Sequence, residues 1–262
     1  MSLMTRREAL ARAGQAGAAL AVGLPAEAAA EEGRAAASLA GREPGARKLK
    51  VIVAGGHPGD PEYGCGGTIA RCTDLGHDVV LLYLNNGEWP TERGGAPADI
   101  RMAEATEACR ILKARPAYAG QQNGRAVLDA AHFDEYRKIL DAERPDVVIT
   151  QWPIDQHRDH RATSALSFDA WKAMNKTFAL YYYEVSNGED TLQFSPTHYV
   201  DISSTEPRKR AACYAHASQT PDRYYELQDK VALFRGIECG YQRAEAFVLQ
   251  VQSPYIALPP AP

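Results

Sequence analysis

Two short segments of the chain combine histidine and aspartate in a pattern that suits metal chemistry. In the first, residues 51–68, an apolar run enters a glycine-rich turn that carries His57 and Asp60. The second, residues 156–160, ends at His160. Neutral imidazoles with one carboxylate suit a catalytic zinc site, which uses three protein ligands and leaves a position for water. We therefore predict that His57, Asp60 and His160 bind Zn²⁺ or another divalent transition metal, which would acidify water and polarise a carbonyl group.

The second segment also holds a histidine that this ligand set leaves free. His157 stands three residues before His160 and could stabilise an oxyanion or give a proton to a leaving amine. Asp159 could orient His157 or shift its pKa. Each residue also has a simpler interpretation. A loop histidine is often a surface or cap residue, and Asp60 could cap the following helix without binding a metal. Two such loops that converge on one point favour the metal site.

Strand-like and helix-like segments alternate along the chain and would position these loops. Short apolar runs predict strands at 48–54, 78–84, 115–119, 147–150, 179–185 and 198–202. Amphipathic patterns predict helices at 66–75, 98–114, 133–141, 161–174, 207–219 and 221–235. This order predicts an α/β fold, Rossmann-like and doubly wound, with a mainly parallel sheet and helices on both faces. Ligands of such sheets bind where the strand order reverses, commonly between the first and fourth strands, so the two histidine loops should meet there.

Length and composition exclude several classes of protein. The chain has 262 residues, 45% of them hydrophobic, which suits one α/β domain, predicted over residues 48–262. A net charge of −4 provides no basic surface for nucleic acid. No apolar run approaches the roughly 20 residues of a membrane span. The five cysteines form no evident disulfide framework and are expected to be buried thiols.

The N-terminal residues are predicted to be a targeting segment. The first three residues are interpreted as a cloning remnant, and Arg6 and Arg7 precede an Ala-, Gly- and Leu-rich run to Leu24. Residues 1–30 therefore resemble a twin-arginine export signal, followed by a flexible linker over 31–47. Export to the periplasm or the outside of the cell follows from this interpretation. The alternative is a disordered Ala-rich tail on a cytoplasmic protein.

The two histidine segments resemble motifs of a known family. Residues 57–67, HPGDPEYGCGG, are close to the AHPDDE…GCGGT motif of the PIG-L/LmbE-like N-acetylglucosaminyl deacetylases, and residues 152–163 resemble their second motif. The similarity runs from about Leu49 to Phe247. It implies a Rossmann-like domain with one metal ion, usually zinc, that removes an acetyl group from an amino-sugar nitrogen. The partner would be a small N-acetylated sugar or glycoconjugate, and a homo-oligomer is expected because members commonly assemble.

The resemblance also assigns roles to individual residues. His57, Asp60 and His160 match the metal ligands of the family, His157 matches the histidine that stabilises the transition state, and Asp159 matches the aspartate beside it. Arg101 matches an arginine that holds substrate, although it could simply pair with Glu104 on a helix.

Three further residues are candidates for contacts with a sugar. Trp89 and Trp152 lie in loops expected at the rim of the site and could stack on a sugar ring. His216 could reach the site from its own subunit or a neighbouring one, or could cap a helix.

One position departs from the family pattern. The first of the two aspartates after His-Pro is the general base of the family, and this position is Gly59 here. Glu62 or Asp155 could replace the base, the metal could suffice with low activity, or the site could bind without catalysis.

The leading interpretation is a metal-dependent N-deacetylase. The alternative is a carbohydrate-binding pseudoenzyme that retains the metal. A nucleotide-binding Rossmann protein is disfavoured because the turn lacks G-x-G-x-x-G.

Overall fold

A computed structural model describes residues 47–185 and 193–259. The predicted export signal and all of the predicted linker except Arg47 lie outside the described residues. No helix in the described part of the chain is both long and apolar enough to cross a membrane. The five cysteines are free thiols, and four of them are buried, in agreement with the sequence.

One sheet of seven strands organises the described residues. Its strand order is β3-β2-β1-β4-β5-β7-β6. The strands are β1 (Lys50–Gly55), β2 (Asp78–Asn85), β3 (Arg115–Gln121), β4 (Val147–Gln151), β5 (Ala179–Tyr183), β6 (His198–Asp201) and β7 (Ala244–Leu249). The first five pair in parallel, and β7 is antiparallel to both β5 and β6. The mainly parallel α/β prediction is confirmed. Strand β7 is absent from the predicted set, because its Ala and Glu residues have low strand propensity.

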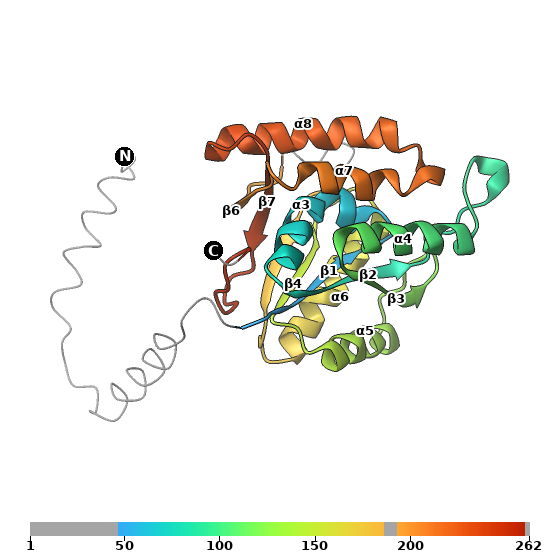
Figure 1. Cartoon of the computed structure of the whole chain (residues 1–262). Helices are drawn as coiled ribbons and strands as arrows, with labels where there is room; N and C mark the ends of the chain where they lie inside the picture. Colours follow the sequence, from blue (N-terminus) through green and yellow to red (C-terminus); the bar gives the residue numbers. More distant parts are fainter. Residues whose placement is uncertain (1–46, 186–192, 260–262) are drawn as a thin grey trace, which may run out of the picture. The chain divides into compact units, whose positions relative to one another are not determined.

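Helices cover both faces of this sheet (Figure 1). They are α3 (Asp60–Asp74), α4 (Ala98–Leu112), α5 (Ala130–Glu143), α6 (Arg158–Ala173), α7 (Glu206–Tyr214) and α8 (Pro221–Cys239), with short 3₁₀ turns η1 (Thr91–Arg93) and η2 (Ala217–Gln219). Helix α3 begins six residues before its predicted start, because Pro61 fits the first turn of a helix. The predicted helix 207–219 divides into α7 and η2.

Alternate residues of the central strand pack into two separate cores. Val51 and Val53 of β1 join side chains of α3, α4, α7 and α8 on one face. Ile52 and Ala54 face the opposite way, toward side chains of α5 and α6. A strand between two helical layers has no solvent face, which explains why β1 is an unbroken apolar run. This burial holds the end of β1 rigidly where the histidine turn begins.

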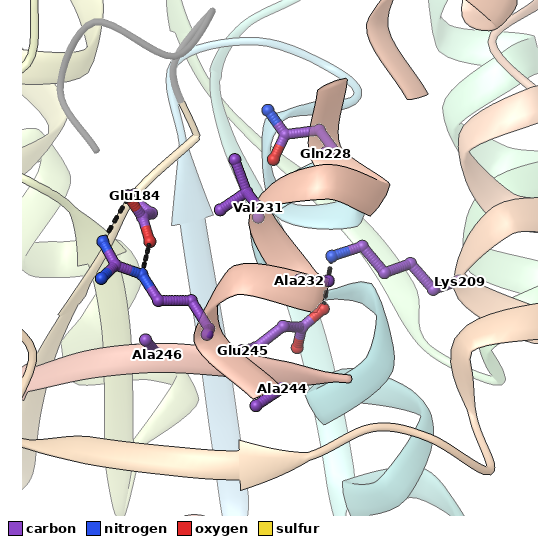
Figure 2. Close-up of a pocket in the computed structure, with 10 residues that line it drawn as sticks. Glu184, Lys209, Gln228, Val231, Ala232, Ala244, Glu245 and Ala246 are labelled. Carbon is purple, nitrogen blue, oxygen red and sulfur yellow. Dashed lines mark hydrogen bonds and ion pairs between the residues drawn. The ribbon is translucent and has the colours of Figure 1, made fainter. Parts of the chain in front are cut away.

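Two buried ion pairs join α7 to β7 and α8 to the residue that follows β5 (Figure 2). Lys209 of α7 lies 2.7 Å from Glu245 of β7, and Arg235 of α8 lies 2.6 Å from Glu184. Glu245 also accepts hydrogen bonds from the backbone N–H groups of Gly67 and Thr68 in α3. The pairs line a pocket of ≈ 10 Å³, about the room that one water molecule needs. None of the predicted metal ligands lines it.

Breaking the Lys209–Glu245 pair should destabilise the domain. Lys209→Met would leave a buried carboxylate without its cation, which should lower the free energy of unfolding by about 3 kcal/mol. Urea denaturation measures the loss, and Lys209→Met combined with Glu245→Gln should recover part of it. Lys230→Met, which removes an exposed pair with Glu226, is the matched control and should change nothing measurable. Equal stability of the two single variants would contradict the prediction.

Candidate active site

The two histidine loops meet at the carboxyl ends of β1 and β4. These strands are neighbours in the centre of the sheet, where the strand order reverses. The turn after β1 carries His57, and the loop after β4 leads to His160 at the start of α6. His160 Nε2 lies 3.3 Å from His57 Nδ1, although 103 positions separate the residues. The order of the strands therefore brings the loops together as the sequence predicts.

Three side-chain atoms form a small triangle at this point. Asp60 Oδ2 lies 3.1 Å from His57 Nδ1 and 3.1 Å from His160 Nε2. The third side is the 3.3 Å between the two histidine nitrogens. Two ligands that each lie roughly 2.0–2.1 Å from a tetrahedral ion are about 3.3–3.4 Å apart. The triangle therefore has nearly the size of one face of a zinc tetrahedron, and the three residues fit such an ion.

His157 completes a cluster of three histidines that could also hold a metal ion. One nitrogen from each of His57, His157 and His160 lies within 4.8 Å of the others. Asp60 Oδ2 lies 3.1 Å from a nitrogen of His57 and 3.1 Å from a nitrogen of His160, well within the 4.8 Å that the three histidine nitrogens span. His157 is also the most exposed of the three histidines. We therefore favour Asp60 over His157 as the third ligand.

Two helix starts and one glycine allow the close approach of these groups. Asp60 is the first residue of α3, and His160 lies in the first turn of α6, so both helix N-termini lie at the site. A Cβ on Gly56 would lie 3.0 Å from His160 Cδ2 and 3.3 Å from Asp60 Oδ2. A larger residue at this position would push α6 away from the turn. Gly56 is thus a condition for the site.

A carboxylate stands behind each of the two predicted histidine ligands, His57 and His160. Asp159 Oδ2 lies 3.2 Å from His57 Nε2, and Asp155 Oδ2 lies 2.9 Å from His160 Nδ1. These contacts use the ring nitrogen that does not face the triangle. Such a partner holds the tautomer and the orientation of a metal-binding histidine. The Asp159 carboxylate is thus placed to orient His57, whereas its position in the sequence suggests that it orients His157. On His157 this carboxylate acts through its charge.

Opposite charges in and around the triangle shift the pKa values of its two histidines and its aspartate. Burial alone would lower the pKa of His160, but the Asp60 and Asp155 carboxylates outweigh it and raise the pKa to about 10. The pKa of His57 is raised for the same reason, by Asp60 and Asp159 against the effect of burial. Burial would raise the pKa of Asp60, yet the two histidines hold it well below the usual value. A cation therefore suits the centre of this triangle.

His157 differs from the other two histidines in charge and in contacts. Burial, with the charges of His57 and His160, lowers its pKa, which favours the neutral ring. The backbone N–H of Asp159 donates to His157 Nδ1 at 3.2 Å, so the neutral ring carries its proton on Nε2. Its ring centre lies 4.7 Å from the ring centres of His57 and His160. His157 therefore offers an N–H donor beside the triangle.

The turn at Gly59 has a backbone conformation that side chains rarely adopt. Gly59 has φ 112° and ψ −37°. A Cβ there would lie 3.6 Å from the Tyr63 ring and 3.8 Å from His216 Cδ2, which is ordinary contact distance. The obstacle to an aspartate is therefore the backbone angle and not a lack of space.

Both carboxylates that could replace the missing base are bonded to the protein. Asp155 accepts from the backbone N–H of His157 through Oδ1, in addition to its contact with His160. Glu62 is fully buried, and its Oε1 accepts from Tyr83 Oη and lies 2.9 Å from His216 Nε2. Glu62 Oε2 has no hydrogen-bond partner among the described residues, but it is also buried. The replacement of the base by either residue stays a prediction that these contacts do not favour.

Arg101 of α4 and His216, which directly precedes η2, are candidate substrate residues that the structure buries in contacts with the protein. Arg101 is 3% exposed and donates to the backbone oxygens of Pro58 and Gly87, besides its pairing with Glu104. His216 is fully buried, contacts Glu62, and makes no side-chain cap to η2. Both therefore support the turn that carries His57 and Asp60, which we call the metal turn. A direct contact with substrate would need these bonds to open, so it stays a prediction.

The two tryptophans have different surroundings. Trp89 is 44% exposed, and its ring lies beside Gly124, whose N–H donates to Asp159 at the site. Trp152 instead packs edge-to-face against Tyr182 and Phe194, which makes it part of the core. Trp89 therefore remains the better candidate for contact with a sugar.

Two residues at the site have no role in the sequence-based prediction. Gln151 and Asn85 each end a buried strand, and their amide groups donate to Asp60 and Asp159. The available signal is a polar amide at the last position of an otherwise apolar strand.

A family comparison agrees with this geometry. Residues 52–171 match the model of the PIG-L family, described as GlcNAc-PI de-N-acetylase. The chain is similar to the PIG-L family over these residues. The matched residues run from β1 into α6 and include the whole triangle, His157 and Gly59. The family resemblance predicted from the two motifs is confirmed.

Individual relatives extend the similarity beyond residues 52–171. The diacetylchitobiose deacetylase of Thermococcus kodakarensis is 29% identical over 219 residues, which are 75% of this chain and 81% of that protein. A conserved protein of Thermus thermophilus has a similar structure, with a TM-score of 0.68 and 29% identity over 79% of this chain and 97% of that chain. The N,N'-diacetylchitobiose deacetylase of Pyrococcus horikoshii shares the fold, with a TM-score of 0.67 and 22% identity over 90% and 98% of the chains.

Proposed function

We propose that this protein is a metal-dependent hydrolase that removes an acetyl group from an N-acetylated amino sugar or a related amide. The observation that carries the proposal is the triangle of His57 Nδ1, Asp60 Oδ2 and His160 Nε2, whose sides of 3.1 to 3.3 Å suit zinc. The name of the Thermococcus kodakarensis relative, diacetylchitobiose deacetylase, supports the substrate class.

Each residue of the site has a distinct task in this proposal. His57, Asp60 and His160 would hold the ion, which supplies Lewis acidity to polarise an amide carbonyl and to acidify water. Asp159 and Asp155 keep the two histidine rings oriented. His157 presents its Nε2–H to the oxygen of the amide, where negative charge develops, because its Nδ1 already accepts the Asp159 N–H. Its neutral form makes this a hydrogen bond without a fixed positive charge.

The missing base defines a second candidate function. Position 59 offers no carboxylate to take the proton from the attacking water. Glu62 and Asp155 are engaged in other hydrogen bonds. General-base assistance is worth about 10²–10⁴-fold, so a slow enzyme is the first expectation. Gly59 equally favours a carbohydrate-binding pseudoenzyme that keeps the metal and has lost turnover.

Acetate release distinguishes the two candidates. Protein stripped of metal and then reloaded with Zn²⁺ is incubated with N,N'-diacetylchitobiose and other N-acetylglucosamine conjugates, and acetate is measured over time. Acetate that forms only after reloading supports the hydrolase. Stoichiometric zinc with sugar binding and no acetate supports the pseudoenzyme. A protein that binds no metal would overturn both.

Export by the twin-arginine route and a homo-oligomer are further proposals. Localisation of the natural chain tests the first, and the mass of the protein in solution tests the second.

Trp89 should contribute to sugar binding. Its exposed ring at the rim offers an apolar face, so Trp89→Ala should weaken binding of an N-acetylglucosamine conjugate to the zinc-loaded protein by about 3- to 10-fold. Calorimetry measures the affinity, and Trp89→Phe, which keeps an aromatic face, should retain most of it. Undiminished binding by Trp89→Ala would rule out a stacking role.

A further inference from the structure

Two buried amide side chains stand behind the carboxylates of the site. Gln151 is the last residue of β4 and Asn85 is the last residue of β2, and both are fully buried. Both strands are buried along almost their whole length, so a polar side chain there must find partners inside the protein. Each amide finds one partner on the backbone and one on a carboxylate.

The partners of Gln151 link the end of β1 to a metal ligand. The backbone N–H of Gly56 donates to Gln151 Oε1 at 2.8 Å. This bond fixes which end of the amide is the oxygen, so the NH₂ group is the end that faces Asp60. Gln151 Nε2 donates to Asp60 Oδ2 at 3.1 Å. That oxygen is the one that forms the triangle with His57 and His160.

Asn85 repeats this arrangement one contact further from the triangle. The backbone N–H of Gly87 donates to Asn85 Oδ1 at 2.8 Å, which again fixes the orientation of the amide. Asn85 Nδ2 donates to Asp159 Oδ2 at 3.2 Å. The same oxygen lies 3.2 Å from His57 Nε2. Asn85 therefore acts on a metal ligand through Asp159.

We propose that Gln151 and Asn85 are positioning residues that set the shape of the metal triangle. Gln151 acts directly on Asp60, and Asn85 acts on His57 through Asp159. An amide suits this task because it donates to a carboxylate without adding charge. A lysine or arginine would repel the ion, and a carboxylate would repel Asp60. The inference rests on the proposed function only in that the triangle binds metal, and it needs no turnover.

Zinc affinity is the measurement that tests the inference. Gln151→Met keeps the length of the side chain and removes both hydrogen bonds. The dissociation constant for Zn²⁺ is measured by competition with a chromophoric chelator, on protein stripped of metal. Loss of a partner behind a metal ligand typically weakens metal binding 10–100-fold, so Gln151→Met should bind zinc about 10–100-fold more weakly. Asn85→Leu should show a smaller loss in the same direction.

A matched variant separates positioning from general stability. Gln228 is a buried glutamine on α8, away from the triangle, so Gln228→Met should leave zinc affinity unchanged. Unfolding of the metal-free proteins is measured in parallel, because a merely structural role would lower stability without changing the dissociation constant of the folded protein. Wild-type zinc affinity in Gln151→Met would overturn this inference and leave the proposed function standing. Absence of zinc binding in the wild-type chain would overturn the metal site and the proposed function with it.

Discussion

Replacing His160 with alanine should remove stoichiometric zinc from the purified protein and abolish acetate release. His160 Nε2 provides one corner of the triangle, and a site with three protein ligands loses a third of them. The variant also leaves Asp155 buried without its imidazole partner. Elemental analysis measures the metal, and the acetate assay with added Zn²⁺ measures turnover.

A histidine away from the site provides the control for this prediction. His132→Ala on α5 removes a ring whose hydrogen-bond partner is Asp129, and it should keep full zinc content and full activity. Circular dichroism and urea denaturation test whether His160→Ala is folded when its metal is measured. Folded His160→Ala with wild-type zinc content would exclude this residue as a ligand.

The second large effect is expected at Gly59. An aspartate there would restore a carboxylate at the position of the family base, which should raise the deacetylation rate by about 10²–10⁴-fold. The same substitution forces φ 112° on a residue with a Cβ, and a conformation of this kind costs about 1–3 kcal/mol. A comparison with wild type alone would therefore mix the gain of a base with the cost of strain.

Gly59→Asn is the variant that separates these two effects. Asparagine has nearly the same shape as aspartate and suffers the same backbone strain, but it cannot accept the proton. The rate of Gly59→Asp divided by that of Gly59→Asn therefore measures the base alone, once zinc content and urea stability show that both variants are folded and loaded. Equal rates in the two variants would mean that the absence of a carboxylate at position 59 does not limit the reaction.

Much of the architecture could be predicted because its signals are local. The apolar run of β1 and the alternation of strands with helices indicate a parallel sheet between two helical layers. Parallel topology then makes a long-range statement, since the loops after the first and fourth strands must meet at the switch point. The approach of His57 to His160 follows from this rule. Helix starts and β7 were harder, because Pro61 resembles a break in a pattern and Glu245 resembles a surface residue.

The partners of each side chain depended on contacts that no spacing reveals. The sequence places Asp159 near His157, yet its carboxylate contacts the ring of His57, which lies 102 positions away in the chain. Arg101 and His216 are candidate substrate contacts by sequence and are buried against the metal turn in the structure. Such choices are set by which donors lack partners after the chain has packed.

The HPGD turn and the HRDH segment predicted the family resemblance, which the comparison confirms, and they predicted the metal ligands and the absent base, because these features depend on residue type and on spacing along the chain. Only the tertiary structure decided what surrounds them. It gave Asp155 and Glu62 other partners, set Gly59 at a φ that resists an aspartate, and brought Gln151 and Asn85 behind the carboxylates. The physical reason is that a buried polar group must bond to whatever packing brings near it, and packing joins residues far apart in the chain.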